Sequence, residues 1–370
     1  MHHAYPGPMA PPVWNAVNER KNEHLQLAAD LRVQRPGRSN GLERLRFEHL
    51  ALPELDLDRI DMGLELLGKR LRAPLLIGAM TGGTNQALEI NQILAQAAEH
   101  CQVGFCLGSQ RAMLSLDPKE VETFQVRSWA PTTLILGNIG GIQLRDHLGS
   151  QDLEHLGDAV GADGMYIHLN PLQEAIQPEG DRDWRGVLDA IGEVAGACNL
   201  PILVKEVGAG LGDRTLQALA LTGIAGVETA GVGGTSWARI ESLRHDRRTP
   251  RQIAGEVLAG FGTCTAESIP LARRALPNRI VIGSGGLRNG LEVATCLALG
   301  ATACAVAQPL LQAASQGVEA VITEIEGIIE TLRITMFLVG AQDLRQLSRT
   351  PLQEDWPVLV TQSAQGRERI

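Results

Sequence analysis

The chain has 370 residues, enough for roughly two domains of about 150 residues or for one α/β barrel of about 250 residues with an extension. Hydrophobic residues make up 44% and charged residues 20% of the chain, so it can bury a sizeable core and wholesale disorder is excluded. The 33 basic and 42 acidic residues give a net charge of -9, which argues against nucleic acid or an anionic membrane as a partner.

The start of the chain and its cysteines indicate the compartment. The first residues (MHHAYPGPMAPPVW) lack the charged segment and apolar stretch of a secretory signal. Six cysteines show neither a CxxC motif nor a Cys/His ligand spacing, which indicates reduced thiols and no structural metal. The stretch 297–314 contains Thr302, Gln308 and Pro309, and we interpret it as helix end, buried strand and loop, not as a membrane span. We therefore expect a soluble, cytoplasmic protein with no membrane partner.

Residues 1–72 precede the repeating part of the chain. They hold a Pro-rich tip, a charged helix start (NERKNEHLQLAAD) and a strand-like region. We predict that they form an N-terminal extension that covers the floor or the mouth of the domain that follows.

From residue 73 onward, short apolar runs alternate with helical patterns, which is typical of βα units in a parallel sheet. Eight such units predict a (β/α)8 TIM barrel over residues 73–348, followed by a C-terminal tail over 349–370. The alternative is an open doubly wound sheet, which normally has fewer repeats and a Gly-rich turn after its first strand. The eight runs are 73–80 (APLLIGAM), 103–108 (VGFCLG), 133–138 (TLILGN), 165–170 (MYIHLN), 201–207 (PILVKEV), 226–230 (GVETA), 279–284 (RIVIGS) and 301–307 (ATACAVA).

A long connection follows the sixth run. It covers residues 232–262 and carries the sequence SWARIESLRHDRRTPR. Loops of this length are commonly lids, so we predict a long loop after strand six that lies near the site.

Chemistry-bearing residues lie at or just past the ends of the runs. In a parallel barrel all these ends open onto one face, so we expect the side chains to converge there. They are Thr81, Ser109, Asn138, His168, Lys205, Thr235 and Gly285.

Two Gly-rich turns, GGTSW at 233–237 and GSGG at 283–286, follow the sixth and seventh runs. Either turn alone is explained equally well as a tight barrel turn. Together with Arg288 at a helix start and AVAQP at 305–309, the pair predicts a phosphate site where backbone N–H groups approach the ligand. Lys205 ends a buried strand, where an unpaired ammonium is costly, so we expect an anionic partner such as the N1–C2 carbonyl region of a flavin. Glu206 should point to the opposite side.

The stretch HLNPLQEAIQPEGDRDWRG at 168–186 is the densest polar stretch after any run. It offers a cation-capable ring, two amides and a carboxylate, which suit a diphosphate chelated through Mg²⁺, although a helix-capping loop would also be polar. Two further sets are candidate anion contacts, with solvated surface charge as the alternative: Arg20 with Lys21, and Ser109 with Gln110 and Arg111.

Several strings together resemble one family. They are RKNEHL (20–25), PLLIGAMTGG (74–83), GSQR (108–111), NIGG (138–141), HLNPLQE with PEGDRDWRG, PILVKEVG (201–208), GGTSWARIE (233–241), SGGLRNG (284–290) and MFLVGAQDLRQL (336–347). In this order, from about residue 18 to about 348, they resemble type II isopentenyl-diphosphate isomerase. The combination of RK, GSQR and HLNPLQE is highly specific, whereas an SGG turn and a lumenal lysine would indicate any FMN barrel.

The resemblance implies an enzyme that interconverts isopentenyl and dimethylallyl diphosphate with reduced FMN, which acts as acid/base and stabilises developing positive charge. It also implies Mg²⁺ on Glu174, NADPH as the reductant of FMN, and a homo-oligomer. The implied catalytic residues are Gln173, as a proton relay, with Thr81 and Glu241. The implied substrate contacts are Arg20, Lys21, Ser109, Gln110, Arg111, His168, Asn170 and Gln173. The implied FMN contacts are Ala79, Met80, Thr81, Ser109, Asn138, Lys205, Thr235, Gly285, Gly286, Leu287, Ala307 and Gln308.

Two positions depart from the family pattern. Glu228-Thr229 stands where Asp-Val is more usual, and Gln308 stands where a basic or small residue is common, so the phosphate end of FMN is expected to be contacted differently. The alternative functions are an FMN-dependent oxidoreductase of the 2-hydroxy-acid oxidase type and a flavin-binding barrel that acts as a sensor or scaffold. The intact RK, SQR and QE sets argue against a scaffold.

Overall fold

The computed structural model describes residues 23, 24, 27, 28, 33, 38–115, 118–244 and 249–354. Arg20, Lys21 and residues 355–370 lie outside the described residues. No helix in the described part of the chain is long and apolar enough to cross a membrane.

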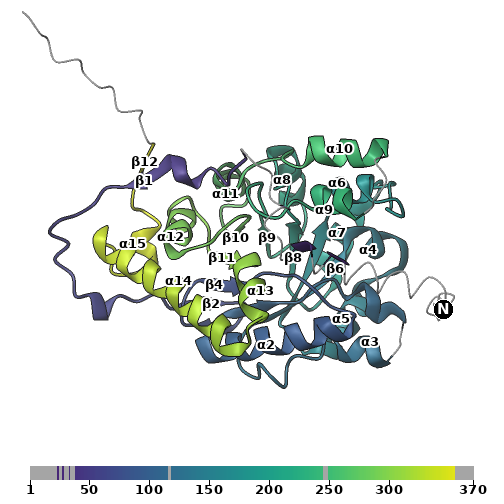
Figure 1. Ribbon diagram of the computed structural model, residues 1–370, viewed down its shortest axis with the longest axis horizontal. Coiled ribbons are helices and arrows are strands. Elements are labelled where there is room, and N and C mark those ends of the chain that lie inside the picture. Colours follow the sequence, from purple (N-terminus) through teal and green to yellow (C-terminus); the bar gives the residue numbers. More distant parts are fainter. Residues whose placement is uncertain are drawn as a thin grey trace, which may run out of the picture.

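Eight parallel strands form a closed barrel, which confirms the predicted (β/α)8 fold (Figure 1). The ring closes because the last strand pairs with the first, with Cys304 opposite Leu75. Every strand overlaps one of the predicted apolar runs. The strands are β4 (Leu75–Ile77), β5 (Gly104–Cys106), β6 (Ile135–Gly140), β7 (Gly164–Leu169), β8 (Ile202–Glu206), β9 (Gly226–Glu228), β10 (Ile280–Ser284) and β11 (Ala303–Val306).

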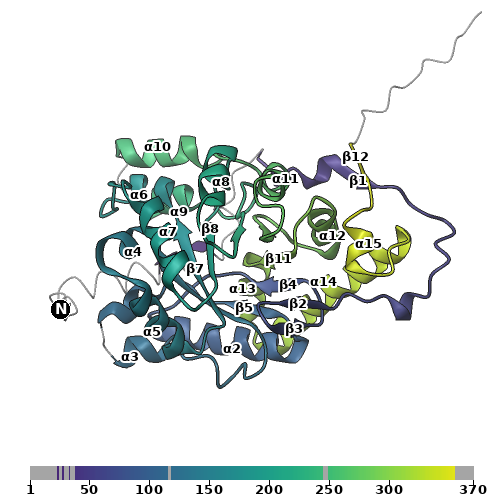
Figure 2. The same cartoon turned by 180° about the vertical axis from the view of Figure 1, so that it is seen from behind.

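Helices surround the barrel, as the two opposite views show (Figures 1 and 2). Side-chain caps fix several of their starts: Thr84 accepts a hydrogen bond from the backbone of Ala87, and Asn289 from that of Glu292. The helices are α2 (Asn85–Cys101), α3 (Pro118–Glu122), α4 (Gly141–His147), α5 (Ser150–Val160), α6 (Pro171–Ile176), α7 (Val187–Ala197), α8 (Asp213–Ala220), α9 (Trp237–Leu243), α10 (Pro250–Leu258), α11 (Thr265–Ala275), α12 (Gly290–Ala298), α13 (Gln308–Ala314), α14 (Val318–Leu338) and α15 (Leu344–Leu347), with 3-10 turns η2 (Leu42–Arg44), η3 (Leu57–Arg59) and η4 (Gln110–Ser115).

A β-hairpin from the N-terminal extension packs against the start of the barrel strands. Its strands β2 (Leu64–Leu66) and β3 (Lys69–Leu71) are joined by Leu67 and Gly68, both at positive φ. Leu66 and Leu71 are buried in one apolar cluster with inward-facing residues of the barrel such as Leu76 and Leu203. The hairpin therefore closes the floor, at the end of the barrel opposite the strand carboxyl ends.

Two segments differ from the predicted loop and tail. The connection predicted as a long loop contains α9 and α10, because Ser236 caps the first helix and Thr249-Pro250 begins the second with a capping box. Within the predicted tail, β12 (Leu352–Glu354) pairs antiparallel with β1 (Leu45–Phe47) of the N-terminal extension. In Figure 1 these two strands lie side by side at the edge of the molecule.

The hairpin floor can be tested with Leu71→Ala. Leu71 is fully buried, so the substitution removes apolar contacts and leaves a cavity. We expect the free energy of unfolding to fall by about 2–5 kcal/mol. Glu65→Ala, at an exposed position of the same hairpin, is the control and should change stability little. Urea denaturation monitored by circular dichroism measures both. Equal stability of the two variants would show that the hairpin is not part of the barrel core.

Candidate active site

A cavity of about 270 Å³ opens at the carboxyl ends of the barrel strands. Gly-rich turns and the strand-end lysine form one part of its wall, and the polar stretch after β7 forms another. It brings together most of the residues singled out from the sequence: Ala79, Met80, Thr81, Ser109, Arg111, Asn138, His168, Asn170, Gln173, Glu174, Lys205, Thr235, Gly285, Gly286, Leu287, Ala307 and Gln308.

Gln110 and Glu241 do not line the cavity. Gln110 is fully buried, and its side-chain amide accepts a hydrogen bond from the backbone of Asn138 and donates to the Leu156 carbonyl. Its side chain therefore ties η4 to β6 and α5 and does not reach the cavity, and the expected contact between Gln110 and substrate stays a prediction. Glu241 lies directly behind the cavity wall.

Lys205 lines the cavity from the end of β8, and it has an acidic neighbour that the sequence reading missed. Its Nζ lies 3.9 Å from Glu228 Oε1 and donates to the Glu206 carbonyl at 2.6 Å. Parallel pairing sets Glu228 of β9 opposite Lys205, and Ser284 of β10 donates to the same carboxylate oxygen at 2.8 Å. Lys205 therefore has an anionic partner within the protein in addition to the ligand expected from the sequence.

Glu206 faces away from this cavity, as the alternation along a strand predicts. Its Oε2 accepts hydrogen bonds from the backbone N–H groups of Val207, Gly208 and Ala209. Burial raises the pKa of the Glu206 carboxyl, and these three bonds counteract the rise. Glu206 thus shapes the turn that follows Lys205.

The two Gly-rich turns lie against each other. Gly285 and Gly286 both have positive φ, and a Cβ on Gly286 would lie 2.4 Å from the Gly233 carbonyl oxygen. The close packing of the two turns therefore requires glycine at position 286, whether or not a ligand is bound. Within the described residues, the backbone N–H groups of Gly286 and Leu287 make no hydrogen bond, so they remain available to a ligand.

The lining fits FMN chemically. Lys205 supplies a cation at the base, Ala79 and Met80 supply an apolar wall, and the glycine turns supply backbone donors for a phosphate. Gln308 also lines this part of the cavity, and its amide donates to the Ala28 carbonyl of the N-terminal segment at 3.0 Å. Gln308, one of the positions that depart from the family pattern, thus connects the chain just after β11 to the N-terminal segment.

His168 is held as a neutral ring. Asn138 donates its amide N–H to the Leu107 carbonyl, so its oxygen faces His168 Nδ1 at 2.9 Å and accepts from it. Burial, together with the positive charges of Lys205 and Arg111, lowers the pKa of His168 to about 3. The ring therefore offers Nε2 as an acceptor at neutral pH, and the sequence-based view of a cation-capable ring is corrected.

Glu174 presents a buried carboxylate to the cavity from the first turn of α6. Its Oε1 accepts from Asn170 at 2.9 Å and its Oε2 from the backbone of Asp181 at 2.8 Å. No cluster of three or more His, Cys, Asp or Glu suited to a metal ion occurs among the described residues. One carboxylate fits Mg²⁺ only where phosphate and water oxygens complete the coordination, which is the usual arrangement for Mg²⁺ with a diphosphate.

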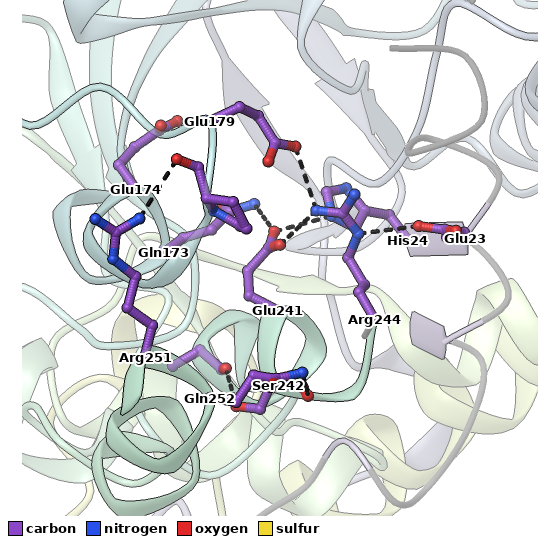
Figure 3. Close-up of polar contacts among 12 residues, drawn as sticks. Glu23, His24, Gln173, Glu174, Glu179, Glu241, Ser242, Arg244, Arg251 and Gln252 are labelled. Atoms are coloured by element: carbon purple, nitrogen blue, oxygen red, sulfur yellow. Dashed lines mark hydrogen bonds and ion pairs between the residues drawn. The ribbon is translucent and has the colours of Figure 1, made fainter. Parts of the chain in front are cut away.

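Gln173 and Glu241 are connected, as shown in Figure 3. Gln173 donates its amide N–H to Glu241 Oε1 at 3.0 Å, while its amide oxygen accepts from Asn170 at 3.1 Å. His24 Nε2 lies 2.9 Å from the same Glu241 oxygen, and the His24 ring meets Trp237 edge-on at 5.1 Å. Both ends of the Gln173 amide are therefore fixed.

Glu241 is ionised although its side chain is fully buried. Burial by itself raises its pKa, but the hydrogen bonds from His24, Gln173 and Arg244 and the charge of His24 outweigh burial and lower the pKa to about 2. An ionised carboxylate can only accept hydrogen bonds, so Glu241 dictates which end of the Gln173 amide faces it.

Four contributing residues were not singled out from the sequence. His24 and Gln143 line the cavity, Trp237 lines it beside His24, and Arg244 lies behind Glu241. The sequence does hold a signal for His24, because this residue lies in the predicted charged helix start, where residues three or four apart are expected to share a face. The sequence gives no comparable signal for Arg244, which lies among other arginines.

Comparisons with known proteins agree with this geometry. Residues 181–354 match the FMN-dependent dehydrogenase family. The isopentenyl-diphosphate delta-isomerase of Synechococcus sp. is 43% identical over 335 residues, which cover 90% of this chain and 96% of that protein. That of Methanosarcina acetivorans is 40% identical over 341 residues, 91% of this chain and 92% of that protein.

Solved structures show the same barrel. A mandelate oxidase with (S)-4-hydroxymandelic acid superposes with a TM-score of 0.58 at 16% identity, covering 90% of this chain and 91% of that one. A mandelate oxidase with benzoyl-formic acid gives 0.58 at 17% identity, covering 90% of each chain. At this identity the likeness concerns the fold alone. Together with the sequence relatives and the FMN-type barrel, these matches show that the chain belongs to the FMN-dependent, type II family of isopentenyl-diphosphate delta-isomerases.

Proposed function

We propose that the protein interconverts isopentenyl and dimethylallyl diphosphate with reduced FMN and Mg²⁺, and that NADPH reduces the flavin. One observation carries this proposal: a lysine, a neutral histidine, a buried carboxylate and Gln173, whose amide is held from behind by Glu241, face a single cavity. The expected cytoplasmic location and homo-oligomer remain part of the proposal.

FMN would be held between Lys205, Thr235 and the turn of Gly285 and Gly286, with Ala79 and Met80 beside it. When bound, the reduced flavin supplies an electron-rich ring that exchanges a proton with the alkene and stabilises positive charge on it. Lys205 lies where it can face the anionic edge of the ring, while Glu228 offsets part of its charge. The other predicted contacts are Thr81, Ser109, Asn138, Leu287, Ala307 and Gln308.

The diphosphate end of the substrate would lie against the polar stretch after β7. Glu174 would hold Mg²⁺, and Arg111, Asn170 and Ser109 would contact phosphate oxygens, with Arg20 and Lys21 as further cations predicted from the sequence. Anchoring the charged end positions a small hydrocarbon that offers few contacts of its own. The binding energy of the diphosphate is thus used to orient the double bond.

Gln173 and Glu241 would carry the proton relay. The Gln173 amide lies at the cavity wall and is hydrogen-bonded to Glu241, which stays ionised in the interior. The negative charge of Glu241 behind this wall can thereby stabilise positive charge that develops in the substrate. Thr81 remains a candidate for the other face of the substrate.

The alternative function is FMN-dependent oxidation of a 2-hydroxy acid. It is considered because residues 181–354 match the FMN-dependent dehydrogenase family and because the barrel resembles that of mandelate oxidases. Such chemistry needs a basic histidine near the reacting carbon. With a pKa of about 3, His168 accepts a proton poorly, and Nδ1 is already held by Asn138. The site therefore favours isomerisation.

The proposed activity can be assayed with protein reconstituted with FMN. Under anaerobic conditions with dithionite and Mg²⁺, we expect conversion of isopentenyl to dimethylallyl diphosphate, because only the reduced ring is electron-rich. The oxidised holoenzyme should be inactive. Failure to retain FMN after gel filtration, or oxidation of (S)-mandelate without any isomerisation, would contradict the proposal.

Glu174→Gln tests the metal ligand. The substitution preserves size and removes the charge, so the Mg²⁺ concentration needed for half-maximal activity should rise, by about tenfold or more, while FMN affinity stays unchanged. Asp189→Asn, an exposed acid on α7, is the control. An unaltered Mg²⁺ activation curve in Glu174→Gln would show that the ligand is another group.

His168 should remain neutral throughout the physiological pH range. Its folded-state pKa of about 3 lies below the ordinary value of 6.5, so the unfolded chain binds this proton first. Between these values, lowering the pH therefore reduces the contribution of His168 to stability. NMR of the histidine ring carbons, assigned with His168→Gln, should show no titration of His168 between pH 8 and pH 5. A midpoint near 6.5 would be contrary to this expectation.

A further inference from the structure

Arg244 follows α9 and lies close to carboxylates from three different segments. Its side chain is only 7% exposed. Its guanidinium contacts Glu241 at 2.6 Å, Glu23 at 3.0 Å and Glu179 at 3.4 Å. Figure 3 shows these acids around one guanidinium.

The three acids belong to different parts of the site. Glu241 lies on α9 and holds the Gln173 amide. Glu23 precedes His24 in the N-terminal segment, and Glu179 lies in the loop after α6, between Glu174 and Asp181. One side chain therefore joins the proton-relay pair, the N-terminal segment and the polar loop.

The guanidinium is suited to this task because it presents several donors in a fixed plane. Nε donates to Glu23, while Nη1 donates to both Glu241 and Glu179. Lysine would place a single ammonium among the same acids and could not reproduce these directions. A neutral residue in place of Arg244 would remove this charged partner from Glu241.

We infer that Arg244 is a positioning residue for the isomerase: it keeps Glu241 and thus Gln173 in their active arrangement and docks the N-terminal segment and the loop after α6 beside the substrate. This inference rests on the proposed function for its kinetic consequence. Its structural consequence is independent of the reaction. Arg244 itself does not line the cavity, so it acts through the residues it holds.

The variants are Arg244→Gln, which removes the charge, and Arg244→Lys, which keeps it. Arg251→Gln is a matched control, because Arg251 lies on the adjacent α10 and reaches the same loop only through the Pro178 carbonyl at 3.4 Å. For the reduced holoenzyme we expect Arg244→Gln to lose kcat by roughly 10- to 100-fold, with FMN affinity within about twofold. Arg244→Lys should recover part of the loss, and Arg251→Gln should behave as the parent protein.

Two further readouts separate positioning from general stability. The pKa of Glu241 should rise when Arg244 is neutralised, because Glu241 then loses a positively charged hydrogen-bond donor, so activity of Arg244→Gln should fall at acid pH where the parent protein still works. Hydrogen–deuterium exchange of the FMN-bound protein should increase in peptides containing Glu23 and Glu179, but not in the barrel strands.

Unchanged exchange at both peptides in Arg244→Gln would overturn the inference, whether or not the parent protein is an isomerase. Absence of isomerase activity in the parent protein would count against the proposed function alone. Parent-like kcat and pH profile in Arg244→Gln would also overturn the inference. If Arg244→Gln exposes the barrel strands, Arg244→Lys decides: local exchange at the two peptides with an intact barrel supports positioning, and parent-like exchange there overturns it.

Discussion

The arrangement of the site depends on charged side chains that are buried away from solvent. Lys205, Glu228, Glu174, Glu241 and Arg244 all have side chains that are largely buried, and each would be unfavourable alone. Each is instead paired or hydrogen-bonded by neighbouring groups. Where the partner is itself charged, as for Lys205 with Glu228 and Glu241 with Arg244, neutralising one side chain removes a partner from the other. These pairs consequently fix the orientation of the side chains at the cavity wall, because each donor faces an acceptor.

Sequence reasoning succeeded where a repeating backbone pattern carried the information. Eight apolar runs that alternate with helical patterns predicted the barrel, and the barrel brings Ser109, Asn138, His168 and Lys205 to one rim. It failed where the partner came from a neighbouring strand or a distant segment. The pairing of Lys205 with Glu228 needs the strand register, and the burial of Gln110 needs the position of α5; neither can be read from a single chain.

The barrel is shared with mandelate oxidases at 16–17% identity, while the sequence relatives are isomerases at about 40%. The first likeness shows the barrel and the second shows the family, because core and rim are under different physical demands. Inward-facing residues of the strands need only fill volume, which many apolar sequences achieve. The rim must supply a particular set of donors and charges, such as the neutral His168 held by Asn138, so chemistry diverges there while the core persists.

The pairing of β1 with β12 has a consequence for the order in which the molecule forms. Phe47 lies opposite Leu352, so this small sheet joins residues from near the two ends of the chain. Closure of the ring itself already needs Cys304 beside Leu75. During synthesis from the amino terminus, the β1 edge therefore stays unpaired until residues 352–354 have emerged, so this pairing of distant residues forms late.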